Sequence, residues 1–247
     1  MNLLEQKHWD YELPWGNVIN PFTTKEIVIV PELVKFQADA IRFSVANGNF
    51  KGYKRGRRWD KILTESQWGI GHIIAKPEAR THFGTYTFRF TLPNFRGSWP
   101  AIWLVDLTPE AHGGMGLPPE IDIFEHFRKD SLLTRFHITH TFHSGPTYEA
   151  DSIQQKVYRK WVPLDWKPIE LVFTWHPTVM SWKVNGKVVM EIGSTIPNFP
   201  TKPMNLLIGA GVSLDWAPKN FEGREFWLHY ATYLPLEIGG KGRRRTL

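Results

Sequence analysis

Apolar residues recur along this chain in short stretches, many of them alternating with polar residues and each closed by Gly, Pro, Asn or Asp. A period of two places successive side chains on opposite faces of a strand, and regularly spaced segments of this kind are typical of an all-β sandwich or barrel. The stretches are KEIVIV near 25, AIRFSV near 40, GTYTFRFTL at 84, WPAIWLV at 99, EIDIFEHF at 120, TRFHITHTF at 134, IELVFTW at 169, MSWKVNGKVVMEI at 180, NLLIGAG at 205 and EFWLHYATYL at 225. The pattern predicts an all-β fold.

Helical periodicity is scarce, and the best candidate for a helix is a short piece near 150–160. Asn185-Gly186 accepts the positive φ angles of a type I′ turn and predicts a tight hairpin. The segment 51–61 reads as a basic loop between two β segments, and 112–119 as a loop rich in Gly and Pro. We expect one domain over 1–247, with residues 1–20 and 239–247 peripheral or flexible.

Composition narrows the classes of protein to consider. The 12 Trp, 16 Phe and 7 Tyr exceed what a core of this size needs, so some rings should be exposed for binding. A net charge of +6 is modest for a nucleic-acid binder. Without cysteine there is neither a disulfide nor a thiol nucleophile.

The N-terminus MNLLEQKHWDYELPW lacks the basic start and apolar stretch of a secretory signal. No run approaches the ~18 apolar residues of a membrane span, so we expect no membrane partner. We expect a protein that acts outside the cell or is released, after removal of a signal, by lysis or within a virus particle.

The stretch PPEIDIFEHF, residues 118–127, carries three carboxylates on a predicted strand. Glu120 and Asp122 are two apart and share a face. Glu125 has the opposite parity and joins that face only if the strand contains a β-bulge, a device found next to active sites. The spacing therefore predicts a bulged strand that presents all three acids together.

Paired carboxylates are the catalytic groups of glycosidases. Four strand steps separate the two Glu backbones by about 13 Å, and side chains that lean together approach the ~5 to 5.5 Å separation of retaining enzymes. Neighbouring carboxylates also raise one another's proton affinity, which keeps one of them protonated. Two alternatives stay open: solvated acids on the polar face of a strand, and a calcium site, for which a straight strand offers poor coordination.

Just upstream, GSWPAIW places Trp99 and Trp103 on one predicted strand face, as sugar platforms or as core residues. With these residues the chain resembles glycoside hydrolase family 16, the laminarinase, agarase and carrageenase group. The resemblance is carried by three motifs in the family's order, HFGTYTFRFTLP (82–93), GSWPAIWLV (97–105) and EIDIFE (120–125), and is extended by IELVFTWHPTVMSWKVNGKVV (169–189). It covers roughly residues 65 to 235.

The resemblance implies a β-jelly roll of two antiparallel sheets with a concave substrate cleft. It further implies Glu120 as nucleophile, Glu125 as acid/base and Asp122 as their hydrogen-bonding and charge-tuning partner. Trp99 and Trp103 would line the sugar subsites. No metal and no catalytic cofactor are implied, although a structural calcium held by backbone oxygens would leave no trace in the sequence.

His143 resembles a cleft histidine that follows the catalytic strand. His137 and His140 lie on the same predicted strand, and a histidine there is more often a structural hydrogen-bonding residue. Two positions depart from the family: Gly209 stands where Asn is common, and His229 where an acid is frequent. These departures leave the substrate open.

The expected function is that of a monomeric, endo-acting, retaining hydrolase of a β-linked polysaccharide, either a β-1,3-glucan or a galactan. The alternative is a non-catalytic, lectin-like jelly roll whose cleft only holds sugar. A third reading, a polyanion or nucleic-acid binder, rests on charge alone. Its basic residues are Lys51, Lys54, Arg55, Arg57, Arg58 and Lys61.

Overall fold

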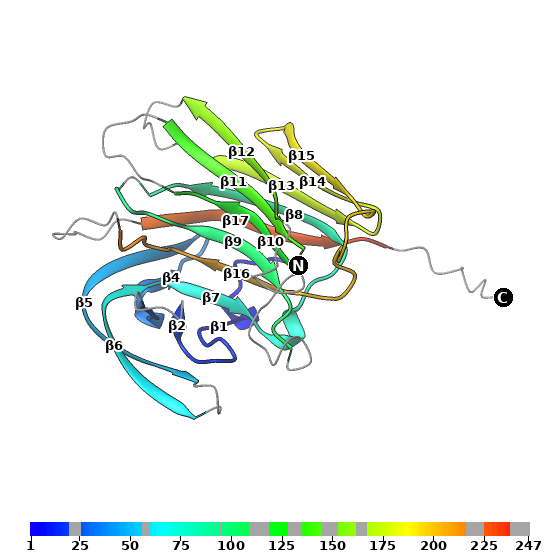
Figure 1. The fold of residues 1–247 in the computed structure, drawn as a ribbon. Helices are drawn as coiled ribbons and strands as arrows, with labels where there is room; N and C mark the ends of the chain where they lie inside the picture. Colours follow the sequence, from blue (N-terminus) through cyan, green and yellow to red (C-terminus); the bar gives the residue numbers. More distant parts are fainter. Residues whose placement is uncertain are drawn as a thin grey trace.

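The structure is a computed structural model, and almost every element in it is a strand (Figure 1). It describes residues 1–19, 26–55, 60–93, 95–108, 119–127, 135–144, 153–161, 167–215 and 225–237, with the backbone alone for 135–137 and 153–161. The predicted loop at 112–119 and the tail at 239–247 lie outside these residues, apart from Pro119. The described part of the chain holds no helix long and apolar enough to cross a membrane.

One sheet has seven strands and carries the acidic segment. All of its neighbouring strands are antiparallel. Its order is β1 (Trp9–Asp10), β7 (His72–Ala75), β16 (Asn205–Gly209), β9 (Ala101–Val105), β10 (Glu120–Glu125), β11 (Arg135–His143) and β12 (Ile153–Trp161).

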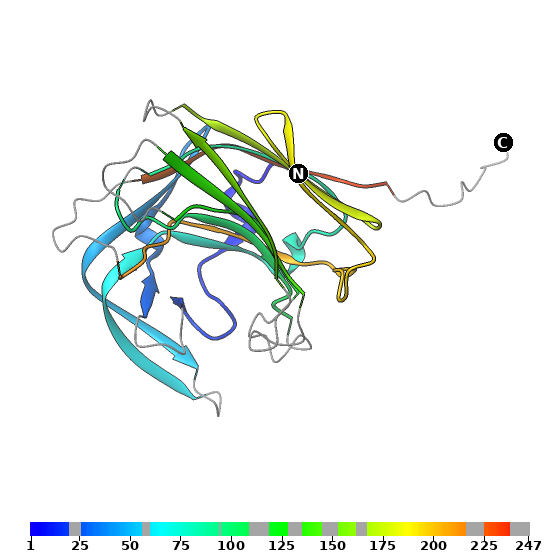
Figure 2. The same ribbon diagram turned by 45° about the horizontal axis from the view of Figure 1, so that its top comes forward.

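The second sheet has ten strands and lies against the first (Figures 1 and 2). Its order is β15 (Lys187–Gly193), β14 (Val179–Val184), β13 (Ile169–His176), β8 (Gly84–Thr91), β17 (Glu225–Pro235), β5 (Ile41–Arg55), β6 (Lys61–Ile70), β3 (Ile27–Ile29) and β2 (Val18–Ile19), with β4 (Val34–Phe36) paired to β5. Three short 3-10 turns, Gln6–His8, Pro31–Leu33 and Pro77–Ala79, complete the described elements.

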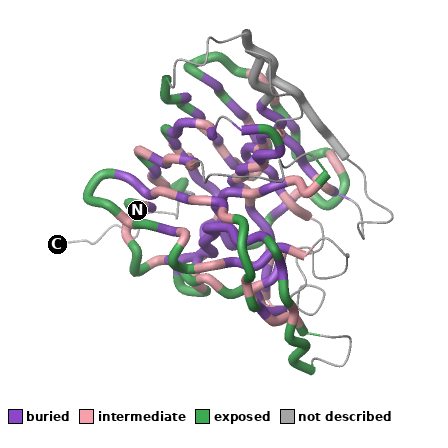
Figure 3. Tube along the Cα trace, turned by 90° about the vertical axis from the view of Figure 1, so that its left-hand side faces the viewer, coloured by how far each residue is buried: buried purple, intermediate pink, exposed green. Residues whose placement is uncertain are grey.

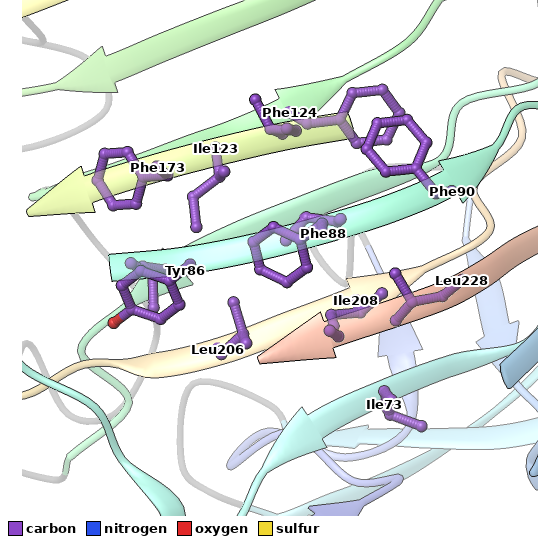
Figure 4. Close-up of a cluster of buried hydrophobic side chains, with 14 of the residues drawn as sticks. Ile73, Tyr86, Phe88, Phe90, Ile123, Phe124, Phe173, Leu206, Ile208 and Leu228 are labelled. Carbon is purple, nitrogen blue, oxygen red and sulfur yellow. The ribbon is translucent and has the colours of Figure 1, made fainter. Parts of the chain in front are cut away.

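The core fills the space between the two sheets. Tyr86, Phe88 and Phe90 alternate along β8 and are fully buried, and Phe124 of the facing sheet packs on Phe90 with 4.5 Å between ring centroids (Figure 4). Buried positions run through both sheets in Figure 3. Burial of one large apolar side chain contributes about 1.5 to 3 kcal/mol. This interior therefore stabilises the seven-stranded sheet, which carries the acidic segment on its other face.

Two local expectations have clear outcomes. The hairpin is confirmed, because Asn185 and Gly186 have φ angles of 48° and 78° and join β14 to β15. The helix near 150–160 is wrong, because β12 occupies that segment and pairs with β11 along its whole length. Its Gln, Lys and Arg residues favour a helix only weakly, and pairing with a distant strand overrides that preference.

The basic segment 51–61 is not simply a loop. β5 continues to Arg55 and β6 begins at Lys61, so the two strands form a long hairpin that extends below the rest of the sandwich in Figure 1. The N-terminal residues are also more integrated than expected. Leu3 and Trp9 are buried, and the Trp9 indole donates a hydrogen bond of 2.9 Å to the Leu3 carbonyl.

A smaller apolar cluster, called the second core below, lies on the outer face of the seven-stranded sheet. Ile74, Val105 and Leu207 point outward from β7, β9 and β16, since their neighbours along each strand face the main core. They are nevertheless buried, because residues from the N-terminal segment and β3 cover them. The members are Leu13, Trp15, Ile29, Ile74, Val105, Leu107 and Leu207. The second core thus closes part of the face on which the acids lie.

Candidate active site

The acidic strand β10 contains the predicted bulge. Its register with both neighbours shifts after Asp122, and Ile123 and Phe124, although adjacent, are both fully buried. On β9, Asp122 pairs with Trp103 and Glu125 with Ala101. Trp103 and Ala101 are two apart on a regular strand, so the bulge returns Glu125 to the outward face that Asp122 occupies.

Glu125 contacts an aromatic residue that itself packs on a second one. The Trp99 indole N–H donates a hydrogen bond of 2.9 Å to Glu125 Oε1, and the Trp99 ring packs on Phe127 with 4.7 Å between centroids. Burial raises the pKa of Glu125, while the Trp99 hydrogen bond and the nearby His143 pull it down. From the sequence we expected neighbouring carboxylates to cause such a rise in pKa, whereas burial is its largest cause.

Asp122 is almost fully buried and contacts His143. His143 Nε2 lies 3.2 Å from Asp122 Oδ2, and His143 stands directly opposite Glu120 in the pairing of β10 with β11. Because a carboxylate only accepts, the imidazole donates this hydrogen bond. The structure therefore brings His143 to the acids, and its role as a cleft histidine stays a prediction.

The other two histidines of this strand differ from His143. His140 faces the main core, where its Nδ1–H donates a hydrogen bond of 2.7 Å to the Ile123 carbonyl. Burial lowers the pKa of His140 to about 4, so its ring is neutral and structural. The side chain of His137 lies outside the described residues.

The carboxylates of Glu120 and Asp122 and the imidazole of His143 offer ligand atoms within 4.8 Å of one another. Such a spacing suits a cation, but the same groups form the acid cluster itself. The expected lack of a catalytic metal or cofactor stays a prediction.

The two tryptophans have different surroundings. Trp99 lies just before β9 and binds Glu125, so it is part of the acid's environment. Trp103 lies on β9 beside Asp122 and is partly buried against the second core. Its side chain remains partly exposed on the face that carries the acids, and its role as a sugar platform stays a prediction.

One further residue on this face, His72, was not predicted from the sequence. His72 of β7 is 5% exposed and meets Trp103 edge-on, with 6.4 Å between ring centroids. Its ring lies over Gly209, where a Cβ would stand 2.2 Å from His72 Cδ2. The departure at Gly209 thus makes room for this imidazole, a relation between positions far apart in the chain that no local pattern reveals.

The other departure lies away from the acids. His229 belongs to β17 in the ten-stranded sheet, and its Nε2 lies 2.7 Å from Thr91 Oγ1. Its neighbour Leu228 faces the main core, so His229 points to the opposite surface of the sandwich. The residue therefore does not contribute to the acid cluster.

The basic hairpin has its own partners. Lys54 forms an ion pair with Glu26, and Lys51 lies 3.5 Å from Glu65. Arg55 Nε donates to the Pro14 carbonyl at 3.2 Å, and Lys61 Nζ lies 4.0 Å from the centre of the Tyr53 ring. Arg57 and Arg58 lie outside the described residues. The basic side chains of this hairpin that the structure describes therefore contact groups of the protein itself.

Comparison with known proteins decides the family. The model of glycosyl hydrolases family 16 matches residues 40–224. The chain belongs to glycoside hydrolase family 16. The expected family and enzyme class, an O-glycosyl hydrolase, are thereby confirmed.

Solved structures support the jelly-roll fold. The laminarinase catalytic domain from Thermotoga maritima MSB8 superposes with a TM-score of 0.69 at 15% identity, over 94% of this chain and 93% of that one. A structure from work on endo-acting O-glycanases of the human gut microbiota gives a TM-score of 0.73 at 19% identity, over 94% and 86%. At such identities the likeness concerns the fold, which is confirmed.

Among curated proteins, a keratan-sulfate endo-1,4-beta-galactosidase of Sphingobacterium multivorum is 35% identical over 69 residues. The match covers 28% of this chain and 15% of that protein's length.

Proposed function

We propose that this family 16 protein is an endo-acting, retaining hydrolase of a β-linked polysaccharide, with Glu120 as nucleophile and Glu125 as acid/base. The observation that carries the acid/base assignment is the contrast between Glu125 and Asp122, two carboxylates on one bulged strand, while the role of Glu120 follows from the family resemblance. Glu125 is partly buried, and desolvation raises its pKa, which favours the protonated form. Asp122 accepts a hydrogen bond from His143. Acid and base roles follow from such contrasts in environment.

The reaction then has two steps. Glu120 attacks the anomeric carbon while Glu125 donates its proton to the departing glycosidic oxygen, giving a covalent glycosyl ester. Glu125, now ionised, removes a proton from water, which attacks the same carbon and releases Glu120. Because the Trp99 indole N–H donates a hydrogen bond to Oε1 of Glu125, Oε2 is the oxygen that carries the proton. Asp122, held by His143, lies between the two glutamates in sequence and orients the nucleophile.

For the substrate we place a galactan-type polymer ahead of a β-1,3-glucan. Support comes from the stretch of 69 residues that is 35% identical to an enzyme named for cleaving keratan sulfate at a β-1,4-galactoside. The laminarinases resemble the chain only at the level of the fold. Since the proposed substrates are polymers found outside cells, we also propose that the enzyme works outside the cell or after release.

A reducing-end assay over purified polysaccharides tests this function. The panel holds keratan sulfate, its desulfated form, agarose, κ-carrageenan and laminarin, and the control is the Glu120→Gln variant. We expect new reducing ends with one of the galactans and products of intermediate length, because an endo-acting enzyme cuts within the chain. Binding of a polysaccharide without any new reducing ends would instead support the lectin-like alternative.

A further inference from the structure

His72 occupies a defined place relative to the acids. Across the seven-stranded sheet, Glu125 pairs with Ala101, Ala101 with Gly209 and Gly209 with His72. Neighbouring strands are ~4.8 Å apart, so the His72 backbone lies about 14 Å from that of Glu125 along this row. The two residues between them, Ala101 and Gly209, carry the smallest side chains of the set. Along this row, therefore, no large side chain stands between Glu125 and His72.

The ring of His72 leans toward the acids. A Cβ at Gly209 would meet His72 Cδ2 at 2.2 Å, then Cγ at 2.8 Å and Cβ at 3.0 Å. The Cδ2 edge of the imidazole therefore faces Gly209, and Nε2, which is bonded to Cδ2, lies on that same edge. The opposite edge carries Nδ1, which is buried and has no hydrogen-bond partner.

This arrangement assigns the proton to one nitrogen. Burial lowers the pKa of His72 to about 3, so the ring is neutral at working pH and has one N–H. A buried N–H without a partner is rarer in proteins than a buried acceptor without one. The enclosed Nδ1 is therefore the bare nitrogen, and Nε2, on the edge facing Gly209, carries the hydrogen.

We propose that His72 is a specificity-determining residue of the glycan cleft, whose Nε2–H donates a hydrogen bond to an uncharged oxygen of the sugar unit that stacks on Trp103. This inference rests on the proposed function. The edge contact between His72 and Trp103 holds the donor beside the platform. The position of the imidazole requires glycine at 209, because any side chain there displaces the ring.

A neutral donor also defines the ligand. A hydroxyl, a ring oxygen or an amide carbonyl accepts such a bond without a charged partner. A sulfate in this position would gain more from a cation, and His72 supplies none. We therefore infer that the unit bound against Trp103 presents an unsulfated face to His72.

Steady-state kinetics of four variants test the proposal on the polysaccharide that the wild-type protein cleaves fastest. His72→Leu removes the donor, and Gly209→Ala displaces the ring. Both should raise KM about three- to tenfold, the worth of one net hydrogen bond, with kcat little changed. His72→Gln keeps an N–H and should recover much of the loss. Ile74→Val, on the same strand and in the second core, should leave KM unchanged. Equal KM values for His72→Leu and His72→Gln would reduce His72 to a packing residue and overturn the proposal.

Imidazole ¹⁵N NMR gives a readout that does not depend on turnover, with the His72 signals identified by their loss in His72→Gln. In the free protein we expect the neutral Nε2–H tautomer at pH 7, and the opposite tautomer would overturn the inference. Oligosaccharides from desulfated keratan sulfate, added to Glu120→Gln, should shift the Nε2 signals. If wild-type enzyme cleaves that polymer and the signals do not move, the His72 inference fails while the proposed function stands. Absence of cleavage across the whole panel would instead remove the function.

Discussion

Trp99 and Glu125 are joined by a hydrogen bond of 2.9 Å from the indole N–H to the carboxylate, the group to which we assign the acid and base steps. The bond has two opposing effects. The indole's apolar body helps to bury the carboxyl and so raises the pKa of Glu125, while its N–H favours the ionised form and lowers that pKa. The balance sets the pH range in which Glu125 holds a proton.

The pH profile of Trp99→Phe tests this balance. A group with a raised pKa is protonated up to that pKa and loses its proton as the pH rises through it, so the alkaline limb of kcat/KM reports Glu125. Phe keeps the apolar bulk and removes the N–H. We therefore expect the alkaline limb to move to higher pH than in wild type. Trp103→Phe is the control and should leave the limb in place, and a move to lower pH in Trp99→Phe would contradict the account.

Replacement of each catalytic carboxylate tests the roles separately. Glu120→Gln should lose turnover by several orders of magnitude, because an amide cannot form the glycosyl ester. Glu125→Gln should be equally damaging on substrates with poor leaving groups, yet azide should partly restore activity on an aryl glycoside with a good one. Both are measured as initial rates, with circular dichroism to verify folding. Rescue of Glu120→Gln rather than Glu125→Gln would reverse the assignments.

Trp103→Ala tests the platform. Stacking on an aromatic ring contributes on the order of 1 to 3 kcal/mol, judged from nucleic-acid bases, so KM should rise and kcat fall. Because Trp103 is only partly buried against the second core, Tm should drop modestly. The comparison is Trp182→Ala, which empties a fully buried site and should cost roughly 3 to 5 kcal/mol of stability. A loss of that size in Trp103→Ala would make Trp103 a core residue.

The buried His140 should make the free energy of unfolding depend on pH. Its pKa falls from the ordinary 6.5 to about 4 on folding, so the unfolded chain binds more protons between these values. The group leaves the free energy of unfolding unchanged above pH 6.5 and lowers it as the pH falls from 6.5 toward 4, at up to about 1.4 kcal/mol per pH unit. His140→Gln should flatten this part of the curve, measured by urea unfolding at several pH values. Parallel curves for the two proteins would show that His140 titrates normally.

Much of the site could be predicted from the sequence because its signals are local. The parity of Glu120, Asp122 and Glu125 requires a bulge if all three serve one face, and Asn185-Gly186 specifies its turn by backbone geometry alone. In both cases the residues that determine the local structure lie within six positions of one another in the chain.

What the sequence could not supply depends on contacts between distant segments. The register that makes β12 a strand is set by β11, and the long hairpin of β5 and β6 is fixed by pairing over its length. The relation of His72 to Gly209 likewise arises only when β7 and β16 lie side by side. The raised pKa of Glu125 comes mainly from burial, which neighbours in sequence do not reveal.

The stereochemistry of the first product tests the central claim, the two-step use of Glu120 and Glu125, most directly. Proton NMR of the best substrate, recorded within the first minutes of cleavage and before mutarotation, identifies the new anomeric centre. Two successive displacements at one carbon restore its configuration, so the account predicts the β anomer as the first-formed product. Initial release of the α anomer would mean a single displacement by water, and would contradict the role of Glu120 as nucleophile.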